Sequence, residues 1–260
     1  MWIYGDTKIK TMITVILNCY KRPEYLKEQI EAIEKQTIKP QEIWIWYNAP
    51  EDEEQIDLSK EFGDYKIITS NHNFKFHGRF SLGLLAKTEY VVFFDDDTIP
   101  GPRWFENCMK TMNVVGDGIL GTAGIFFQGT EDKFAYVPHQ KVGWNGSHID
   151  GISRVDLVGH SWFLRKSSLK YLFYEEPLTW DNGEDIQLSY LALKYGNIQT
   201  FVPPHPENNQ QWWGSMKDKG WEYGSDDNAS WKKGSHLDLR NKIVINYKND
   251  GWKPSFSRNK

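Results

Sequence analysis

The amino-acid sequence predicts an α/β fold with a mostly parallel, Rossmann-like sheet, and the pattern of its N-terminal part supports this prediction. Residues 12–17 form a continuous β-branched run, typical of a strand covered on both faces. A helical pattern then opens at Pro23, with apolar Leu26, Ile30 and Ile33 at three-to-four spacing. Further strands are expected at 42–47, 66–69 and 89–94, and a further helix at 79–86. This alternation indicates parallel strands joined by right-handed crossovers.

The second half of the chain carries fewer regular signals. Strands are expected at 119–127, 155–164 and 198–202, and helices from Pro102 and over 184–195, the latter capped by Gly196. The stretch up to about Arg154 is expected to be irregular, and the tail from Pro203 a long loop. We therefore expect one domain over 1–260, whose two main parts are about 12–100 and about 101–205, with a C-terminal lid or tail at about 206–260.

Composition excludes several functional classes. With 39% hydrophobic and 25% charged residues, the 260-residue chain falls within the range of globular proteins. A formal net charge of −4 argues against a nucleic-acid binder, which would need many contacts from Lys and Arg to phosphates. No apolar run reaches the roughly 20 residues that cross a bilayer. Two cysteines and no signal-like N-terminus favour a cytoplasmic protein of microbial or viral type.

The strongest local signal is an apolar strand, 90–94, that ends in Asp95, Asp96 and Asp97. Adjacent carboxylates raise one another's pKa unless a cation or hydrogen-bond donors compensate. A divalent ion with hard oxygen ligands, Mn²⁺ or Mg²⁺, is the simplest compensation. An acidic turn at a strand end is the structural alternative. The position after a buried strand favours the metal site, because open parallel sheets bind ligands at the carboxyl ends of their strands.

Taken together, four pieces of the sequence resemble the nucleotide-sugar-dependent glycosyltransferases of the GT-A fold. The resemblance is strongest to family 2, extends more distantly to exostosin-like enzymes, and covers about residues 12–205. It is carried by the run Val15 to Leu26, by the strand ending in Tyr47-Asn48, by the triplet Asp95 to Asp97, and by Asp181-Asn182-Gly183-Glu184-Asp185. The order and spacing of these pieces make the resemblance specific.

The resemblance implies a donor site for a nucleoside-diphosphate sugar, with a uridine nucleotide favoured. Asn48 replaces an Asp that often hydrogen-bonds the base in such enzymes, and Arg79-Phe80 matches part of an Asn-Arg-Phe element. In the triplet, the resemblance implies that Asp95 and Asp96 face the ribose and that Asp97 holds the metal, with Asp95 and His205 as further ligands. The donor residues implied are Asn18, Tyr20, Arg22, Asn48, Arg79, Asp95 and Asp96.

The same resemblance implies that residues at about 12–100 form the nucleotide-binding half and residues at about 101–205 the acceptor and catalytic half. Asp185 corresponds to the family 2 base that takes the acceptor's hydroxyl proton during inversion, although Glu184 is an alternative, and a retaining, exostosin-like mechanism stays open. Both carboxylates also suit an ordinary helix start. The sugar and acceptor residues implied are His160, Trp162, Asp181, Trp212 and Trp213. Packing is the alternative role for each of the aromatic ones. Trp212 and Trp213, together with Trp221 and Tyr223, are expected to form a lid over donor or acceptor.

The sequence thus predicts the metal-dependent transfer of a hexose-type sugar from a nucleoside-diphosphate sugar to a glycan or glycoprotein hydroxyl. A sugar-nucleotide nucleotidyltransferase is one alternative, although the loop after the first strand, residues 18–23, has no glycine to cradle phosphate. A noncatalytic carbohydrate-binding protein is the other. It would account for the 12 Trp, 13 Tyr and 14 Phe, because flat rings suit sugar faces, but it would leave the carboxylates without a role.

Overall fold

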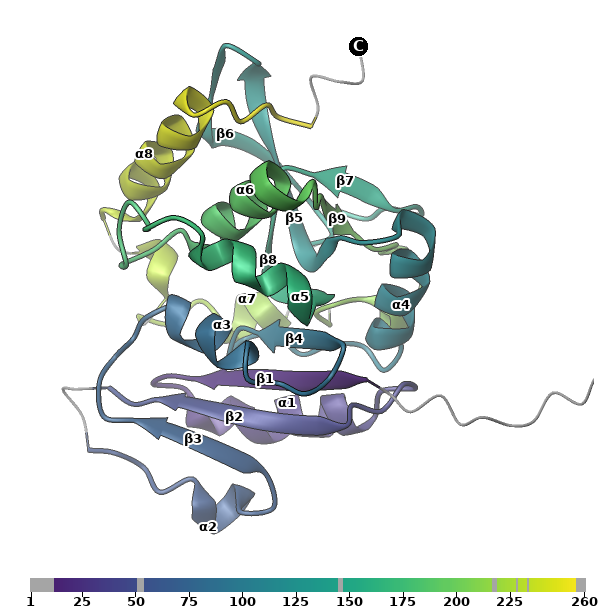
Figure 1. Cartoon of the computed structure of the whole chain (residues 1–260). Coiled ribbons are helices and arrows are strands. Elements are labelled where there is room, and N and C mark those ends of the chain that lie inside the picture. Colours follow the sequence, from purple (N-terminus) through teal and green to yellow (C-terminus); the bar gives the residue numbers. More distant parts are fainter. Residues whose placement is uncertain are drawn as a thin grey trace, which may run out of the picture.

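The computed structural model describes residues 12–50, 54–144, 147–216, 219–227, 229–232 and 234–255. These residues form one nine-stranded sheet in the order β3-β2-β1-β4-β8-β5-β9-β7, with β6 paired to β5 (Figure 1). The strands are β1 (Ile13–Cys19), β2 (Glu42–Asn48), β3 (Lys66–Ser70), β4 (Tyr90–Phe94), β5 (Ile119–Thr130), β6 (Lys133–Val142), β7 (Ser153–Val155), β8 (Leu157–Arg165) and β9 (Thr200–Val202). The main helices are α1 (Leu26–Glu34), α2 (Ser59–Phe62), α3 (His77–Gly83), α4 (Trp104–Val115), α5 (Lys166–Leu169), α6 (Glu184–Gly196), α7 (Lys219–Tyr223) and α8 (His236–Asn249). Short 3₁₀ turns are η1 (Pro23–Tyr25), η2 (Lys170–Phe173), η3 (Gln210–Trp212) and η4 (Ser230–Lys232).

The N-terminal half has the parallel pairing that the sequence predicts. Strand β1 lies between β2 and β4 and pairs in parallel with both, and β2 pairs in parallel with β3. The second half makes the sheet mixed, because β8 runs antiparallel to β4 and β5 runs antiparallel to β8. The α/β fold is confirmed, and its parallel part presents the carboxyl ends of β1, β2 and β4 at one edge.

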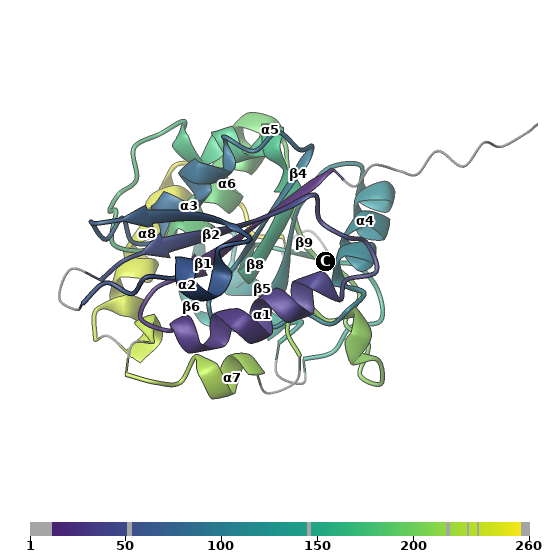
Figure 2. The same cartoon turned by 90° about the horizontal axis from the view of Figure 1, so that it is seen from below.

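Helices cover both faces of the sheet (Figures 1 and 2). On one face, α1 and α4 pack on β1 and β4 in an apolar layer that contains Ile30, Phe94 and Trp104. On the other face, α3, α5 and α6 pack through residues such as Phe80 and Leu188. Both faces of the central strands are therefore buried, which is why β1 and β4 read as continuous apolar runs.

A third apolar group lies where the sequence predicted irregular structure and a loop. Strand β6 and helix α8 pack against the far end of β5 and against α6, and α8 contributes Ile243, Val244 and Tyr247. The prediction that the tail from Pro203 is a long loop is wrong over α8. The stretch before Arg154, predicted to be irregular, contains β6. Both elements bury only a narrow stripe, and one of the buried residues of α8 is Arg240, so their apolar periodicity is weak in the sequence.

Smaller differences concern element ends. The helix expected from Pro23 begins as η1, and α3 covers 77–83 rather than 79–86. The strand expected at 198–202 begins at Thr200, and Asn197, after Gly196, is the left-handed residue that ends α6. Such shifts of one to three residues are ordinary, because chain ends of helices fray and local signals there are weak.

One glycine sets the start of the helix that carries the two candidate catalytic carboxylates. Gly183 precedes α6 with φ 86°, in the left-handed region. A Cβ there would lie 2.4 Å from Cδ1 of Ile243, so α8 packs directly on the glycine backbone. Glycine is required at this position both for its backbone conformation and for the close approach of α8.

We expect Gly183→Ala to destabilise the fold more than Gly116→Ala does. Gly116 has φ 82° but nothing within 4 Å of a built Cβ, so its substitution introduces only backbone strain, about 1–2 kcal/mol. Gly183→Ala adds a steric conflict with Ile243 that is worth roughly a further 1–3 kcal/mol. Urea unfolding of both variants measures the difference. Equal losses would show that α8 does not press on the start of α6.

Candidate active site

The Asp95 to Asp97 triplet leaves the sheet in a tight turn held by a buried glutamine. The amide of Gln29, on α1, donates to the backbone carbonyls of Asp95 and Thr98, both at 2.8 Å. The Thr98 amide also donates to the Asp95 carbonyl at 3.1 Å. Because the backbone turns here, Asp95 reaches Arg79, whereas Asp96 and Asp97 lie on the side of Arg22.

Asp95 is linked to helix α6 through a buried arginine. Arg79, on α3, is 2% exposed and donates to a carboxylate oxygen of Asp95, while its other terminal nitrogen lies 3.4 Å from the Glu184 carboxylate. The guanidinium is stacked on the indole of Trp162, 4.7 Å from the ring centroid. Arg79, predicted to reach the donor, is thus committed to two carboxylates, and Trp162 is a buried support for it.

Asp96 and Asp97 share a second arginine. Arg22, in the loop after β1, lies 2.9 Å from Asp96 and 3.9 Å from Asp97. Burial and the Asp97 charge raise the pKa of Asp96 to about 7, against the opposing effect of Arg22. Burial also acts to raise the pKa of Asp97, but its interactions with the His160 imidazole and Arg22 outweigh burial and lower it. Asp97 is therefore the carboxylate held in its charged form.

His160 turns toward the triplet because β8 carries a bulge. The β5–β8 register shifts between Gly121 and Ala123, and His160 adopts φ 64°. Its Nδ1 lies 3.8 Å from Oδ1 of Asp97 and 4.0 Å from Oδ2 of Asp95, and its ring stacks on Trp144 at 3.7 Å. Bulges commonly redirect one side chain beside a functional site. The bulge converts a strand residue into a group that faces the carboxylates.

The residues around this point fit a divalent cation. Asp95, Asp97 and His160 each offer one ligand atom, and these atoms lie within 4.8 Å of one another. Nδ1 of His160 is buried and has no hydrogen-bond partner. An unpartnered ring nitrogen aimed at two carboxylates is the arrangement that a metal ion satisfies.

His205, the third ligand expected from sequence, is not part of this group. Its ring is buried and stacks on Trp213 at 4.5 Å, and its backbone bridges to Ile149. Burial, reinforced by His148, lowers the pKa of His205 to about 3. The geometry places His160, which the sequence assigned to the sugar pocket, where His205 was expected.

The other predicted donor-binding residues lie at the same sheet edge, and they differ in how far their side chains are used in contacts within the protein. Asn48 uses its whole amide to shape the loop after β3: it donates to Oδ1 of Asn73 at 2.8 Å and accepts from the Phe74 amide at 2.9 Å. Asn18, at the end of β1, and Tyr20 are half-buried. The Lys21 ammonium lies over the Tyr20 ring at 5.7 Å.

Glu184 and Asp185 begin α6 and face different partners. Asp185 accepts from the Ile186 amide at 2.8 Å and from Arg240 of α8 at 2.6 Å. Glu184 faces Arg79, and burial together with the Asp185 charge raises the pKa of Glu184 to about 7. The two neighbouring carboxylates are thus distinguished by their arginines.

The predicted acceptor residues separate into an exposed and a packed set. Asp181 is exposed and forms an ion pair with Lys75, joining the loop before α6 to the loop after β3. Trp212 packs between Arg103 and Lys110 of α4, at 4.3 and 4.6 Å from its ring centroid. The Trp213 indole donates to the Pro206 carbonyl at 2.8 Å. Both tryptophans thus have packing partners.

Part of the C-terminal tail lies over the site, in the region where the sequence predicted a lid that includes Trp221 and Tyr223. The side chain of Trp221 lies outside the part of the chain that the structure describes, and the role of Asp226 was not predicted. We call residues 219–227 the covering segment. The Tyr223 ring stacks on Tyr25 at 3.9 Å, and Asp226 is paired with Arg22. Figure 2 shows α7 beside α1. The signal available in the sequence was the acidic pair Asp226-Asp227 after a glycine, which is too common in loops to identify a contact 204 residues away.

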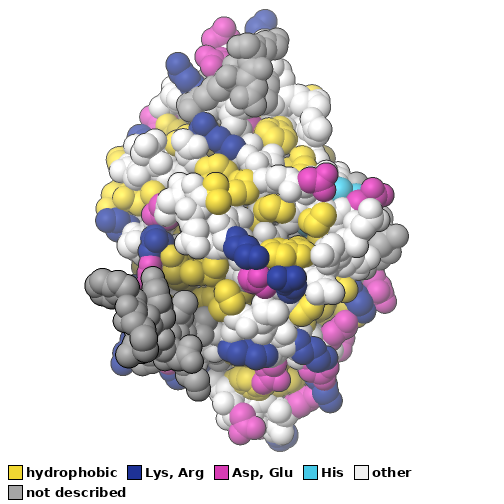
Figure 3. All heavy atoms as spheres, turned by 90° about the vertical axis from the view of Figure 1, so that its right-hand side faces the viewer, with side chains coloured by type: hydrophobic (Ala, Val, Ile, Leu, Met, Phe, Trp, Pro, Cys, Tyr) yellow, Lys and Arg dark blue, Asp and Glu magenta, His cyan; other side chains and the backbone are white. Residues whose placement is uncertain are grey.

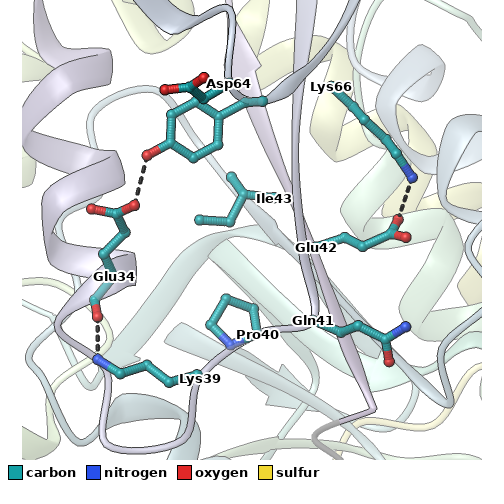
Figure 4. Close-up of a pocket in the computed structure, with 9 residues that line it drawn as sticks. Glu34, Lys39, Pro40, Gln41, Glu42, Ile43, Asp64 and Lys66 are labelled. Carbon is teal, nitrogen blue, oxygen red and sulfur yellow. Dashed lines mark hydrogen bonds and ion pairs between the residues drawn. The ribbon is translucent and has the colours of Figure 1, made fainter.

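Surface hollows elsewhere do not compete with this site. A pocket of about 480 Å³ lies at the amino ends of β2 and β3, away from the triplet, and several of its polar side chains are paired with one another (Figure 4). Within it, Tyr65 donates to Glu34 at 2.7 Å and Lys66 to Glu42 at 2.9 Å. On the face drawn in Figure 3, cationic and anionic side chains are mixed among apolar ones, so neither sign of charge dominates that view.

Comparison with known proteins agrees with the fold and identifies the family. The family model described as glycosyl transferase family 2 matches residues 14–173, which include Asp95 to Asp97 and His160. A Methanocaldococcus jannaschii protein described as an uncharacterized glycosyltransferase is 25% identical over 210 residues, 74% of this chain and 70% of that protein.

Two crystal structures of S. aureus TarS are also similar. One has a TM-score of 0.50 at 16% identity, covering 74% of this chain and 36% of the other. The second, of TarS residues 1–349, has a TM-score of 0.47 at 14% identity, covering 74% and 60%. The chain thus spans less than two thirds of each TarS structure, and the likeness with the TM-score of 0.50 concerns the fold alone.

The sheet, the acidic triplet at its carboxyl edge and these matches define a glycosyltransferase of the GT-A fold. The chain belongs to glycosyl transferase family 2. No helix among the described residues is long and apolar enough to span a membrane.

We expect substitution of His160, and not of His205, to weaken Mn²⁺ binding. His160→Ala removes the ring nitrogen that faces Asp95 and Asp97, and should lower Mn²⁺ affinity at least about tenfold. His205→Gln keeps a polar side chain at a position packed on Trp213, and should leave the affinity within about twofold. Titration with Mn²⁺ in the presence of UDP measures both, after circular dichroism confirms folding. Loss of affinity in His205→Gln alone would return the ligand role to His205.

Proposed function

We propose that the chain transfers a hexose from a nucleoside-diphosphate sugar, with UDP favoured, to a hydroxyl of a glycan or glycoprotein in a metal-dependent reaction. The observation that carries this proposal is the group of Asp95, Asp97 and His160 at the end of a parallel strand. It lies beside Arg22 and is linked through Arg79 to the start of α6. Metal ligands, a cation for phosphate and two candidate bases thus belong to one connected network.

The donor half of the proposal assigns the diphosphate to the metal and Arg22. A bound Mn²⁺ or Mg²⁺ would neutralise charge on the leaving nucleoside diphosphate as the glycosidic bond breaks. The mixed set of two carboxylates and one imidazole favours Mn²⁺ of these two. Arg22 presents a planar fork that suits phosphate oxygens. Asn18 and Tyr20 are proposed to contact the nucleoside, whereas Asn48 acts by shaping the 73–75 loop.

The acceptor half assigns proton removal to Asp185, with inversion at the sugar carbon. The arrangement that supports it is a carboxylate oriented by neighbouring donors, here Arg240 and the Ile186 amide, which hold it in place. Glu184 is proposed to hold Arg79 in place. Because Arg79 also binds Asp95, this contact would fix the position of the donor-site carboxylate relative to the start of α6, which carries the base.

A carbohydrate acceptor is supported by the rim of the site. Trp180 is 53% exposed, one residue before the Asp181–Lys75 ion pair, and its ring edge rests on buried His77 at 4.9 Å. Phe74, beside Lys75, is equally exposed. Flat exposed rings next to charged hydrogen-bonding groups suit the two kinds of surface on a pyranose.

Donor hydrolysis tests the proposed reaction. Incubation with UDP- and GDP-hexoses plus Mn²⁺ is expected to release nucleoside diphosphate, and EDTA or Asp97→Ala should reduce the release by about 10²-fold or more, because metal stabilisation of the leaving group is lost. Asp64→Ala, in the pocket at the opposite sheet edge, is the control and should retain activity. Release unaffected by chelation would contradict metal dependence, and no release from any sugar nucleotide would favour a noncatalytic role.

Isosteric substitutions and the pH dependence of the rate distinguish the roles of the two carboxylates at the start of α6. Asp185→Asn should lower kcat by about 10²–10⁴-fold, and Glu184→Gln by much less, because general-base catalysis is worth about that range. Glu184, with its pKa raised to about 7, is charged only above that pH. A rate that rises with pH to a midpoint near 7 in the wild type, and loses this rise in Glu184→Gln, would assign the proton transfer to Glu184 instead.

A further inference from the structure

The covering segment places a carboxylate on the phosphate-binding face of Arg22. Nε and Nη2 of Arg22 donate to the two carboxylate oxygens of Asp226 at 2.9 and 2.5 Å, while Nη1 donates to Asp96 at 2.9 Å. The Nε and Nη2 side of a guanidinium can donate two parallel hydrogen bonds to one carboxylate or one phosphate. In this arrangement Asp226 occupies that side of Arg22.

The same segment lies against the metal-site carboxylate. A Cβ on Gly224 would sit 2.3 Å from Oδ2 of Asp97, so the segment's backbone passes directly over that oxygen. His160 approaches the other oxygen, Oδ1. The side of Asp97 toward His160 is left for a cation, whereas the side toward Arg22 is covered by Gly224.

The covering segment is anchored by contacts that do not involve the acidic triplet. Tyr223 stacks on Tyr25, and its hydroxyl contacts Glu28 of α1. Lys219 lies 3.1 Å from Glu28. Gly220 packs on Trp144, the ring that supports His160, where a Cβ would meet the indole at 2.0 Å. These contacts keep Asp226 near Arg22 and hold it at a high local concentration.

We propose that Asp226 is a built-in competitor of the donor diphosphate, which must displace it from Arg22 to bind. This inference rests on the proposed function, because it takes Arg22 as a diphosphate group. The same two N–H groups cannot bind Asp226 and a phosphate at once, so the Asp226 contact weakens phosphate binding and a bound phosphate weakens the Asp226 contact. The segment therefore sets the affinity for the donor and opens when the donor arrives.

Calorimetric titration with UDP and with GDP, each with Mn²⁺, tests the competition. Asp226→Asn keeps the shape of the side chain and removes its charge, and should tighten diphosphate binding about two- to fivefold, the range expected for a partly exposed ion pair. Asp227→Asn is the matched control: it makes the same charge change one residue along, on a fully exposed side chain, and should leave the affinity unchanged.

Each outcome separates this inference from the proposed function. If the wild type binds neither nucleotide with Mn²⁺, both are overturned. If it binds one, and Asp226→Asn binds that nucleotide equally or more weakly, competition is wrong and the Arg22–Asp226 pair supports the donor site. Equal tightening in Asp227→Asn would assign the effect to overall charge.

Hydrogen exchange on the wild-type protein gives an independent reading. Amides of residues 219–227 should exchange faster when UDP and Mn²⁺ are added, because the diphosphate releases Asp226 from Arg22. Slower exchange would mean that the segment closes over the donor, and would overturn displacement even if the calorimetric result were favourable.

Discussion

The mutual repulsion of three consecutive carboxylates at the end of β4 is the constraint on which the site depends. Each carboxylate is held by a different cation or potential cation: Asp95 by Arg79, Asp96 by Arg22, and Asp97 by His160 with a longer contact to Arg22. Removing one partner of such a buried pair typically costs about 3–5 kcal/mol, because a charge is left without compensation. The surrounding elements therefore serve chiefly to deliver these partners to one sheet edge.

The partners come from distant parts of the chain, which ties the two halves together. Arg22 follows β1, Arg79 lies on α3, and His160 reaches the triplet through a bulge in β8. Arg79 also reaches Glu184, while Arg240 of α8 holds Asp185. The network thus runs from the metal-site carboxylates to the start of α6, and α8 fixes its far end. In the proposed function, the donor-binding and acceptor-activating residues therefore belong to one electrostatic network.

Local patterns were sufficient for the elements whose burial is nearly complete. The strands β1 and β4 and the helix α6 were predicted because buried segments give long apolar runs or clear periodicity. The antiparallel insertion of β8 between β4 and β5 was not predictable, since pairing partners depend on contacts across the sheet. Strand β6 and helix α8 escaped for a related reason: they bury only one narrow face, so solvent-exposed polar residues hide the pattern.

The sequence alone determined the α/β class, the position of the acidic triplet after a buried strand, and the acidic start of α6, because these depend on adjacent residues. The tertiary structure decided which groups meet. It placed His160 rather than His205 beside Asp97, committed Arg79 to two carboxylates, and laid Asp226 on Arg22. Such pairings join residues up to about 200 positions apart, and only the folded chain, by closing those long loops, specifies them.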